Sequence, residues 1–382
     1  MKIMMVVTHL LGTGHLSRSL VLGRAFAMAG HHVTLVSGGM PAPHLDLSGV
    51  EFRQLPALRS DGVQFTKLLD DTGAAASENL LQERKDMLQA VLHQTRPDVV
   101  ITELFPFGRR VLAAEFTALL EAAKATTPRP VICASVRDIL APPSKPAKVQ
   151  ATETLLHRFY DAVLVHSDQA VTPLDISWPV SPAVQEKLRY TGFVAPPACG
   201  RHPDGLGAGE IIVTAGGGNV GAALFDCCLA AAAATPARQW RLLVGGVSAQ
   251  ETIAALRRKA GPNVILTPVT PDFRQMLYEA AASVSLCGYN TALDILQAGT
   301  PAVFVPFDAG GEVEQSLRAE ALSKMPAIGV VRSSELSAGT LLSALETVMK
   351  APRNNRQIHG LNGAENTVRV VETLAGAARH ET

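Results

Sequence analysis

One pattern occurs twice in this chain: a strand-length apolar run, a loop with glycines, and a helical pattern. In the first copy, apolar residues 3–7 precede Gly12 and Gly14, and the helical periodicity ends at Gly30, before an apolar run at 33–36. In the second copy, residues 211–214 precede a glycine-rich turn and an alanine-rich helix at 220–234. Because strand–helix–strand units cross over in the right-handed sense, the pattern predicts parallel sheets. The expected fold class is α/β, with two Rossmann-like domains facing a central cleft.

The rest of the chain continues the alternation of strands and helices. Further strands are expected at 98–102, 131–135, 163–166, 242–245, 264–267, 283–286 and 302–305, and helices at 80–92, 249–259, 272–281, 335–349 and 364–377. Residues 56–82 lack periodicity and predict a long loop, and the Pro- and Gly-rich segment 192–209 is the candidate linker. We therefore expect domains at 1–198 and 209–350, followed by a helical segment at 351–382.

Composition narrows the class of protein. The chain has 382 residues, 47% of them hydrophobic and 18% charged, which suffices for two large cores. Lys plus Arg equals Asp plus Glu, at 34 each, which argues against a nucleic-acid binder that needs a dominant basic field. Five cysteines without C-x-x-C spacing favour free thiols in a reducing compartment and imply no metal site. With no signal-peptide core and no apolar run of about 20 residues, we expect a cytoplasmic protein with at most peripheral membrane contact.

The stretch 283–315 carries most of the chemical information. An apolar run ends at Gly288, and a helix opens directly afterwards at Tyr289, Asn290 and Thr291. The first N–H groups of a helix lack intrahelical partners and lie at its positive end, so this turn suits a phosphate. Asp294 follows about one turn later, where its carboxylate can accept hydrogen bonds from two ribose hydroxyls. The pattern therefore suggests a nucleotide. Taken singly, Thr291 and Asp294 are better explained as a helix-capping residue and a solvated carboxylate, and only the whole constellation favours the nucleotide.

The first glycine loop contains a histidine where a strand gives way to a helix. His15 follows Gly14, and the loop lacks the Gly-Lys-Ser/Thr of a P-loop and the third glycine of the dinucleotide fingerprint. Because a histidine ordinarily titrates near neutral pH, His15 is the candidate general base. The alternative is that it only caps the helix or contacts a phosphate.

Two further strand ends carry candidate acceptor contacts. Glu103, Phe105, Phe107 and Arg109 follow the strand at 98–102, and Arg137 follows the strand at 131–135. Aromatic and basic side chains in a turn can contact an acceptor or a lipid headgroup. The alternative interpretation, in which the two phenylalanines fill the core, is about equally supported.

The stretch 288–315 resembles the carboxyl-domain signature of family 28 glycosyltransferases, which include the N-acetylglucosaminyltransferase of peptidoglycan synthesis and belong to the UDP-glycosyltransferase superfamily. Gly288, Thr291 and Asp294 match its glycine, threonine and acidic residue, although the acid is usually Glu. The pairs at 306–307 and 314–315 match its proline–aromatic and paired polar residues, with one extra residue between them and Glu for the first Gln. Gly-x-Gly-His at 12–15 resembles the amino-terminal loop of the same family. With Arg18, it also resembles the nucleotide-sugar hydrolase of the pseudaminic acid pathway.

The resemblance implies a GT-B enzyme that transfers a sugar from a nucleotide-diphosphate donor, with UDP as the expected nucleotide, to a hydroxyl acceptor with inversion and without a metal or cofactor. The acceptor would be a small molecule, a lipid-linked glycan or an envelope glycan, bound by the first domain, and the last helix would cross back to that domain. His15 would be the base. The implied donor residues are Gly14, Gly216, Gly217, Gly218, Asn219, Val269, Thr270, Gly288, Tyr289, Asn290, Thr291, Asp294, Glu314 and Gln315. A nucleotide-sugar hydrolase and a non-catalytic nucleotide-sugar binder stay open as alternatives.

Overall fold

The structure is a computed structural model that describes residues 1–60, 67–216, 220–353 and 360–380. It divides into two compact units. The first domain comprises Met1–Val194 and Asn362–Thr382, and the second comprises Ala195–Leu361. Each is described here by itself. None of the five cysteines, all of which lie among the described residues, forms a disulfide.

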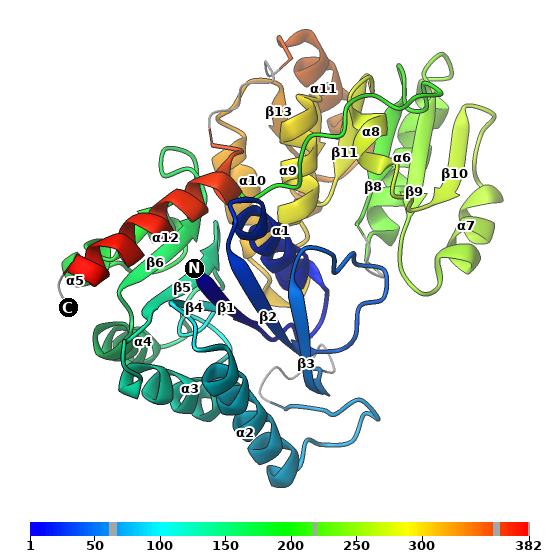
Figure 1. Ribbon diagram of the computed structural model, residues 1–382. Coiled ribbons are helices and arrows are strands. Elements are labelled where there is room, and N and C mark those ends of the chain that lie inside the picture. Colours follow the sequence, from blue (N-terminus) through cyan, green and yellow to red (C-terminus); the bar gives the residue numbers. More distant parts are fainter. Residues whose placement is uncertain (61–66, 217–219, 354–359, 381–382) are drawn as a thin grey trace. The chain divides into compact units, whose positions relative to one another are not determined.

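The first domain is built on a seven-stranded parallel sheet in the order β3-β2-β1-β4-β5-β6-β7 (Figure 1). Its strands are β1 (Lys2–Val7), β2 (His32–Gly39), β3 (Glu51–Leu58), β4 (Val99–Glu103), β5 (Val131–Arg137), β6 (Ala162–His166) and β7 (Leu188–Tyr190). Strands buried on both faces need apolar residues at nearly every position, which is why β1 and β4 read as continuous apolar runs.

Helices cover both faces of this sheet. They are α1 (Gly14–Met28), α2 (Glu78–Thr95), α3 (Ala113–Ala125), α4 (Pro146–Phe159), the short α5 (Pro182–Gln185) and α12 (Gly363–His380), with 3-10 turns η1 (Arg110–Leu112) and η2 (Leu174–Ile176). Met4 and Val6 pack in one core with α2, α3 and α4, whereas Ile3 and Met5 pack in another with α1 and α12. Figure 1 shows α2, α3 and α4 together along one side of the sheet.

Helix α12 joins the first domain although it comes last in the chain. Val368, Val371 and Ala375 are buried in the core that α1 and β1 share. The N–H of Gly363 donates to the carbonyl of Phe193 at 3.0 Å, which fixes the start of the helix against the end of the domain's first segment.

The second domain has a six-stranded parallel sheet in the order β10-β9-β8-β11-β12-β13. Its strands are β8 (Ile211–Thr214), β9 (Trp240–Val244), β10 (Val264–Pro268), β11 (Ala282–Ser285), β12 (Ala302–Phe304) and β13 (Ile328–Val330). Its helices are α6 (Ala222–Ala234), α7 (Ala249–Arg257), α8 (Phe273–Leu277), α9 (Tyr289–Ala298), α10 (Glu314–Leu322) and α11 (Ala338–Lys350), with 3-10 turns η3 (Ala309–Gly311) and η4 (Ser333–Glu335). The expectation of an α/β fold with two Rossmann-like domains is confirmed.

Both sheets reverse their strand order beside their first strand. In the first domain β1 lies between β2 and β4, and in the second β8 lies between β9 and β11. Open α/β sheets bind ligands at the carboxyl ends of the strands at such switch points. The glycine loop after β1 and the turn after β11 therefore lie where this architecture places a site.

Several elements were absent from the sequence-based expectation, among them strand β13 and the short helix α5. Strand β3 occupies the start of the predicted loop at 56–82, and β7 and α4 were also missed. β3 is an edge strand whose residues alternate irregularly between buried and half-exposed and include Pro56. Helix α4 begins at Pro146, so its start was hidden in a proline-rich loop.

Candidate active site

His15 lies in the first turn of α1. The helix begins at Gly14, and its first-turn N–H groups have no intrahelical partner. The N-cap residue Thr13 makes no side-chain hydrogen bond to them. The side chain of His15 is 16% exposed, and its Nδ1 lies 3.0 Å from Glu103 Oε1. The strand order brings these two residues together, because β1 leads directly into α1 and pairs with β4.

Glu103 is the last residue of β4 and is only 4% exposed. Its Oε1 contacts Arg18 Nη2 as well as His15, and its Oε2 accepts a hydrogen bond from Ser135 Oγ at 2.7 Å. Both carboxylate oxygens are therefore held by charged or polar partners. A buried carboxylate with such partners stays ionised.

The electrostatics of this pair define one protonation state. Burial lowers the pKa of His15 to about 3, although its hydrogen bond to Glu103 opposes the shift. For Glu103, burial acts to raise the pKa, but Arg18, His15 and Ser135 outweigh it and hold the pKa at about 2. At neutral pH the imidazole is neutral and the carboxylate is charged. Nδ1–H then donates to Glu103, and Nε2 carries the lone pair of a base.

Arg109 stabilises the neighbouring loop. It has a left-handed backbone conformation, and its Nε donates to the carbonyl of Thr8 at 2.6 Å. Burial lowers the pKa of Arg109 to about 10, and nearby Glu103 opposes this shift. Arg137 donates through its Nε to the carbonyl of Ile139 at 3.1 Å. Both arginines thus make backbone hydrogen bonds, and any acceptor contact of theirs stays a prediction.

Of the two interpretations of Phe105 and Phe107, the structure supports the one in which both rings fill the core. Phe105 is 0% exposed and stacks on Phe116, with ring centroids 4.7 Å apart. Phe107 is 3% exposed and meets Trp178 edge-on at 5.2 Å. The turn folds both aromatic rings into the core beneath α3 and α4, where they bury the most apolar area.

In the second domain, the turn after β11 has the predicted form. α9 starts at Tyr289, its N-cap Gly288 has no side chain to cap it, and a Cβ at Gly288 would meet no atom within 4 Å. Beneath the turn, the 2% exposed Arg318 donates to the carbonyl of Cys287 at 2.9 Å, and its guanidinium lies 5.7 Å from the centre of the Tyr289 ring. A positive charge therefore supports a helix N-terminus that is itself suited to phosphate.

Asp294 makes an ion pair that was not expected. Arg274 Nε donates to Asp294 Oδ1 at 3.0 Å. Burial raises the pKa of Asp294 to about 6, and Arg274 limits this rise. Arg274 Nη2 also donates to Gln297 Oε1 at 2.6 Å and to the carbonyl of Pro197 at 2.8 Å. Asp294 is thereby coupled to the segment that opens the second domain.

The pair at 314–315 begins α10. Gln315 Oε1 accepts from the N–H of Phe307 at 3.2 Å, and the Glu312 carboxylate accepts from the N–H of Glu314 at 2.6 Å. These bonds hold the loop after β12 against the helix start. Contacts of either side chain with a sugar stay a prediction.

The remaining donor residues lie on loops at strand ends. Gly216 has a φ of 75°, a left-handed conformation that favours glycine, and Gly217, Gly218 and Asn219 lie outside the described residues. Val269 follows β10 and is 41% exposed, and Thr270 Oγ1 accepts from the N–H of Asp272 at 3.2 Å.

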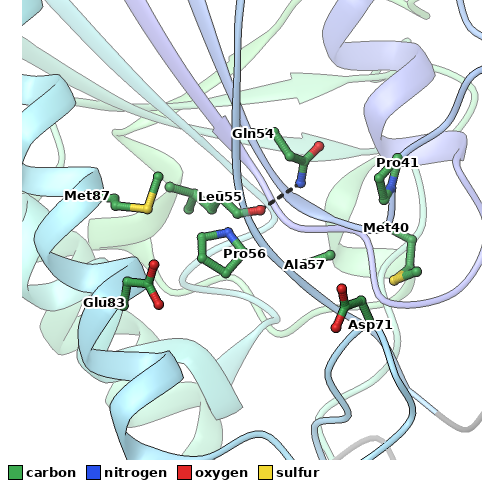
Figure 2. A pocket seen from close by; sticks show the side chains of 9 residues that line it. All are labelled: Met40, Pro41, Gln54, Leu55, Pro56, Ala57, Asp71, Glu83 and Met87. Atoms are coloured by element: carbon green, nitrogen blue, oxygen red, sulfur yellow. Dashed lines mark hydrogen bonds between the residues drawn. The ribbon is translucent and has the colours of Figure 1, made fainter.

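A separate pocket of about 490 Å³ lies in the first domain beside β3 and α2 (Figure 2). It is lined by Met40, Pro41, Gln54, Leu55, Pro56, Ala57, Asp71, Glu83 and Met87. Gln54 Nε2 donates to the carbonyls of Ser37, Gly39 and Leu55. The amide that lines the pocket is therefore held mainly by the carboxyl end of β2. Figure 2 shows the two carboxylates on opposite sides of Pro56 and Ala57.

Sequence reasoning missed Ser135, Arg274 and Arg318. Ser135 and Glu103 occupy paired positions on neighbouring strands, so the strand order alone would have identified Ser135. The two arginines lie within helices, where nothing in the local pattern distinguishes them from solvated residues. No helix among the described residues is long and apolar enough to span a membrane.

The fold is that of a GT-B protein. The solved structure of MurG from Acinetobacter baumannii matches with a TM-score of 0.62 at 16% identity, over 97% of this chain and 99% of that one. Residues 211–370 match the family described as Glycosyltransferase family 28 C-terminal domain. This match covers most of the second domain.

Curated relatives carry the name UDP-N-acetylglucosamine--N-acetylmuramyl-(pentapeptide) pyrophosphoryl-undecaprenol N-acetylglucosamine transferase. The protein from Brucella anthropi is 33% identical over 142 residues, which are 36% of this chain and 38% of that protein. The protein from Paraburkholderia xenovorans is 26% identical over 357 residues, which are 89% of this chain and 86% of that protein. The chain thus spans less than half of the first relative and most of the second.

Proposed function

We propose that this protein is an inverting, metal-independent glycosyltransferase that moves a sugar from a nucleotide-diphosphate donor to a hydroxyl acceptor. The observation that carries the proposal is the His15–Glu103 pair at the switch point of the first domain, in a chain whose residues 211–370 match the family 28 C-terminal domain. A neutral imidazole whose Nδ1 is hydrogen-bonded to a buried carboxylate can act as a general base through Nε2.

In the proposed reaction, an acceptor hydroxyl loses its proton to His15 Nε2 as its oxygen forms a bond to the anomeric carbon of the donor sugar. The bond from that carbon to the diphosphate oxygen breaks, and its electron pair leaves with the nucleoside diphosphate. Attack opposite to the leaving group inverts the anomeric configuration. Glu103 stabilises the imidazolium as it forms, because its charge lies at Nδ1.

The second domain supplies the proposed donor contacts. The N–H groups at the start of α9 would bind the diphosphate, with the buried Arg318 adding positive charge behind the turn. Asp294 Oδ2 would accept from ribose, since Oδ1 is occupied by Arg274. Val269 and Thr270 at the end of β10 would contact the base, and Glu314 and Gln315 the sugar.

The relatives' names motivate the choice of substrates. They name UDP-N-acetylglucosamine as donor and a pyrophosphoryl-undecaprenol compound as acceptor. We propose a UDP-sugar as donor and a lipid-linked or envelope glycan as acceptor. The shorter acid at 294, the loop with one extra residue and Glu314 in place of Gln leave room for a different sugar.

The test is a screen of UDP-, TDP-, GDP- and ADP-sugars for release of nucleoside diphosphate, with and without a cell extract as acceptor. We expect release from a UDP-sugar that depends on acceptor, with a glycoside of inverted configuration by NMR. His15→Ala should lower this release by about a hundredfold or more, whereas His157→Ala, which removes an exposed histidine from α4, should leave it unchanged. Release of free sugar without acceptor would instead identify a hydrolase, and binding without turnover a non-catalytic protein.

A further inference from the structure

A chain of buried hydrogen bonds continues from Glu103 across the carboxyl edge of the first sheet. Ser135 Oγ, on β5, donates to Glu103 Oε2 at 2.7 Å, and His166 Nε2, at the end of β6, lies 2.9 Å from Ser135 Oγ. His166 Nδ1 lies 2.9 Å from Thr191 Oγ1, just beyond β7. Ser135, His166 and Thr191 are each at most 1% exposed.

The bonds have one consistent direction. Ser135 has a single hydroxyl proton and donates it to Glu103, so it must accept from His166, which requires the Nε2–H tautomer. Burial lowers the pKa of His166 to about 3, so its ring is neutral and Nδ1 accepts from Thr191. With His15 Nδ1–H donating from the other side, these donors all point toward the Glu103 carboxylate.

The stability of the fold does not by itself account for such a chain. Burying polar groups costs free energy unless each is satisfied, and apolar residues of similar volume often replace such groups without loss of stability. The elements involved also follow the sheet order: His15 comes after β1, and the next members lie at β4, β5, β6 and β7. These hydrogen bonds therefore connect the proposed base to the edge strand β7 through every intervening strand.

We propose that Ser135 and His166 are positioning residues, which act through Glu103 to fix the orientation and tautomer of His15. Glu103 has two oxygens and three competing partners, and Arg18 contacts the same oxygen as His15. By occupying Oε2, Ser135 prevents the carboxylate from rotating so that both oxygens face Arg18. His166 in turn fixes the direction in which Ser135 donates. The expected effect on kcat rests on the proposed function. The expected effect on the orientation and tautomer of His15 does not.

The first experiment needs no substrate. In protein with ¹⁵N-labelled histidine, NMR shifts report the tautomer of each ring, and His15→Ala and His166→Ala variants identify the signals. We expect Nδ1–H for His15 and Nε2–H for His166 in the wild type. Ser135→Ala should move the His15 signals toward a mixture of tautomers. Ser19→Ala should not, because Ser19 is an equally buried serine on α1 whose hydroxyl makes no hydrogen bond to the described residues.

The second experiment is kinetic. Ser135→Ala should lower kcat by about tenfold with KM for the donor within about twofold, the signature of an orientation effect. His166→Phe should behave like Ser135→Ala, and His166→Gln, which keeps a donor near the Nε2 position, should restore part of the loss. Thermal unfolding of each variant checks that it folds.

Unchanged His15 signals in Ser135→Ala overturn the inference. So does a Ser135→Ala enzyme whose kcat matches that of Ser19→Ala. If the wild type transfers no sugar, the proposed function fails, and the tautomer of His15 in the Ser135→Ala protein still decides whether the chain positions that ring.

Discussion

Arg274 donates from Nε to Asp294 Oδ1 across 3.0 Å, and its Nη2 holds the carbonyls of Pro196 and Pro197 at 3.2 and 2.8 Å. One guanidinium thus joins the proposed ribose acid to the first residues of the second domain. Gln297 strengthens the same contact by donating to Pro196 at 2.9 Å. Binding at Asp294 and the position of this segment are therefore physically coupled.

Replacing Asp294 by Ala should weaken binding of UDP by about 1.5–3 kcal/mol, the range for hydrogen bonds to a charged group. Calorimetric titration at pH 7.5 measures it. Asp226→Ala is the control, because Asp226 pairs with Lys259 on the surface of the same domain. Equal affinity in the Asp294 variant and the control would remove Asp294 from the ribose site.

Affinity for a UDP-sugar should fall as the pH is lowered through about 6. Burial raises the pKa of Asp294 to about 6, so its carboxylate gains a proton there and becomes a weaker acceptor. The diphosphate of a UDP-sugar is doubly esterified and does not titrate in this range. Asp294→Asn should bind more weakly at pH 7.5 and show a flatter profile from pH 7.5 to 5. A variant profile as steep as that of the wild type would assign the dependence to another group.

His15→Ala should lower turnover by about a hundredfold or more while leaving the donor affinity nearly constant. Because burial lowers the pKa of His15 to about 3, the wild-type rate should show no acid limb near pH 6.5 from this residue. Steady-state kinetics at saturating donor, with His157→Ala beside it, provide the measurement. A variant that loses donor affinity and keeps its turnover would make His15 a phosphate contact.

Stability should decrease as the pH falls below about 6.5. His15 and His166 have pKa values of about 3 in the fold, below the usual 6.5, so the unfolded chain binds protons that the folded chain does not. Each histidine then removes up to about 1.4 kcal/mol per pH unit between 6.5 and 3. Glu103, with a pKa of about 2, adds to this loss below about 4.5. Urea midpoints from pH 8 to 4 test this, and His166→Gln should reduce the slope.

Arg84 and Glu115 give a prediction about stability alone. Arg84 is 0% exposed, forms two 2.9 Å bonds to the Glu115 carboxylate, and donates to the carbonyl of Gly38 at 3.0 Å. Arg84→Met should cost about 3–5 kcal/mol, because it leaves a buried carboxylate unpaired. Arg84→Met with Glu115→Leu should cost clearly less. Urea unfolding measures both, and equal costs would show that the carboxylate finds another partner.

The fold could be predicted from sequence where strands are buried on both faces. The run at 3–7 is apolar throughout, the run at 211–214 is apolar up to Thr214, and their strands match these bounds within one residue. Edge strand β3 could not, because a half-exposed strand carrying Pro56 has neither an apolar run nor clean alternation. The pattern of apolar residues identifies a strand through the burial of its side chains. It therefore does not identify a strand that is only partly buried, such as β3.

The candidate site was predictable only one residue at a time. His15 and Glu103 were each singled out, although they lie 88 positions apart along the chain. Their pairing depends on β1 and β4 being neighbours in the sheet. For a related reason, the sequence could not decide whether Phe105 and Phe107 fill the core or contact an acceptor. Adjacency to arginines in sequence does not determine which side of a turn faces the core, and Phe116 and Trp178, which receive the two rings, are distant in sequence.

Helix α12 has a consequence for the order of synthesis. The second domain consists of one continuous segment, Ala195–Leu361, and can fold as soon as that segment leaves the ribosome. The first domain is translated earlier, yet the face of its sheet that carries Ile3 and Met5 is covered only in part, by α1, until Val368, Val371 and Ala375 emerge. The domain that starts the chain is therefore the last to be completed. A truncation after residue 361 would expose apolar surface on the first domain, which holds His15, although His15 lies far from the deletion along the chain.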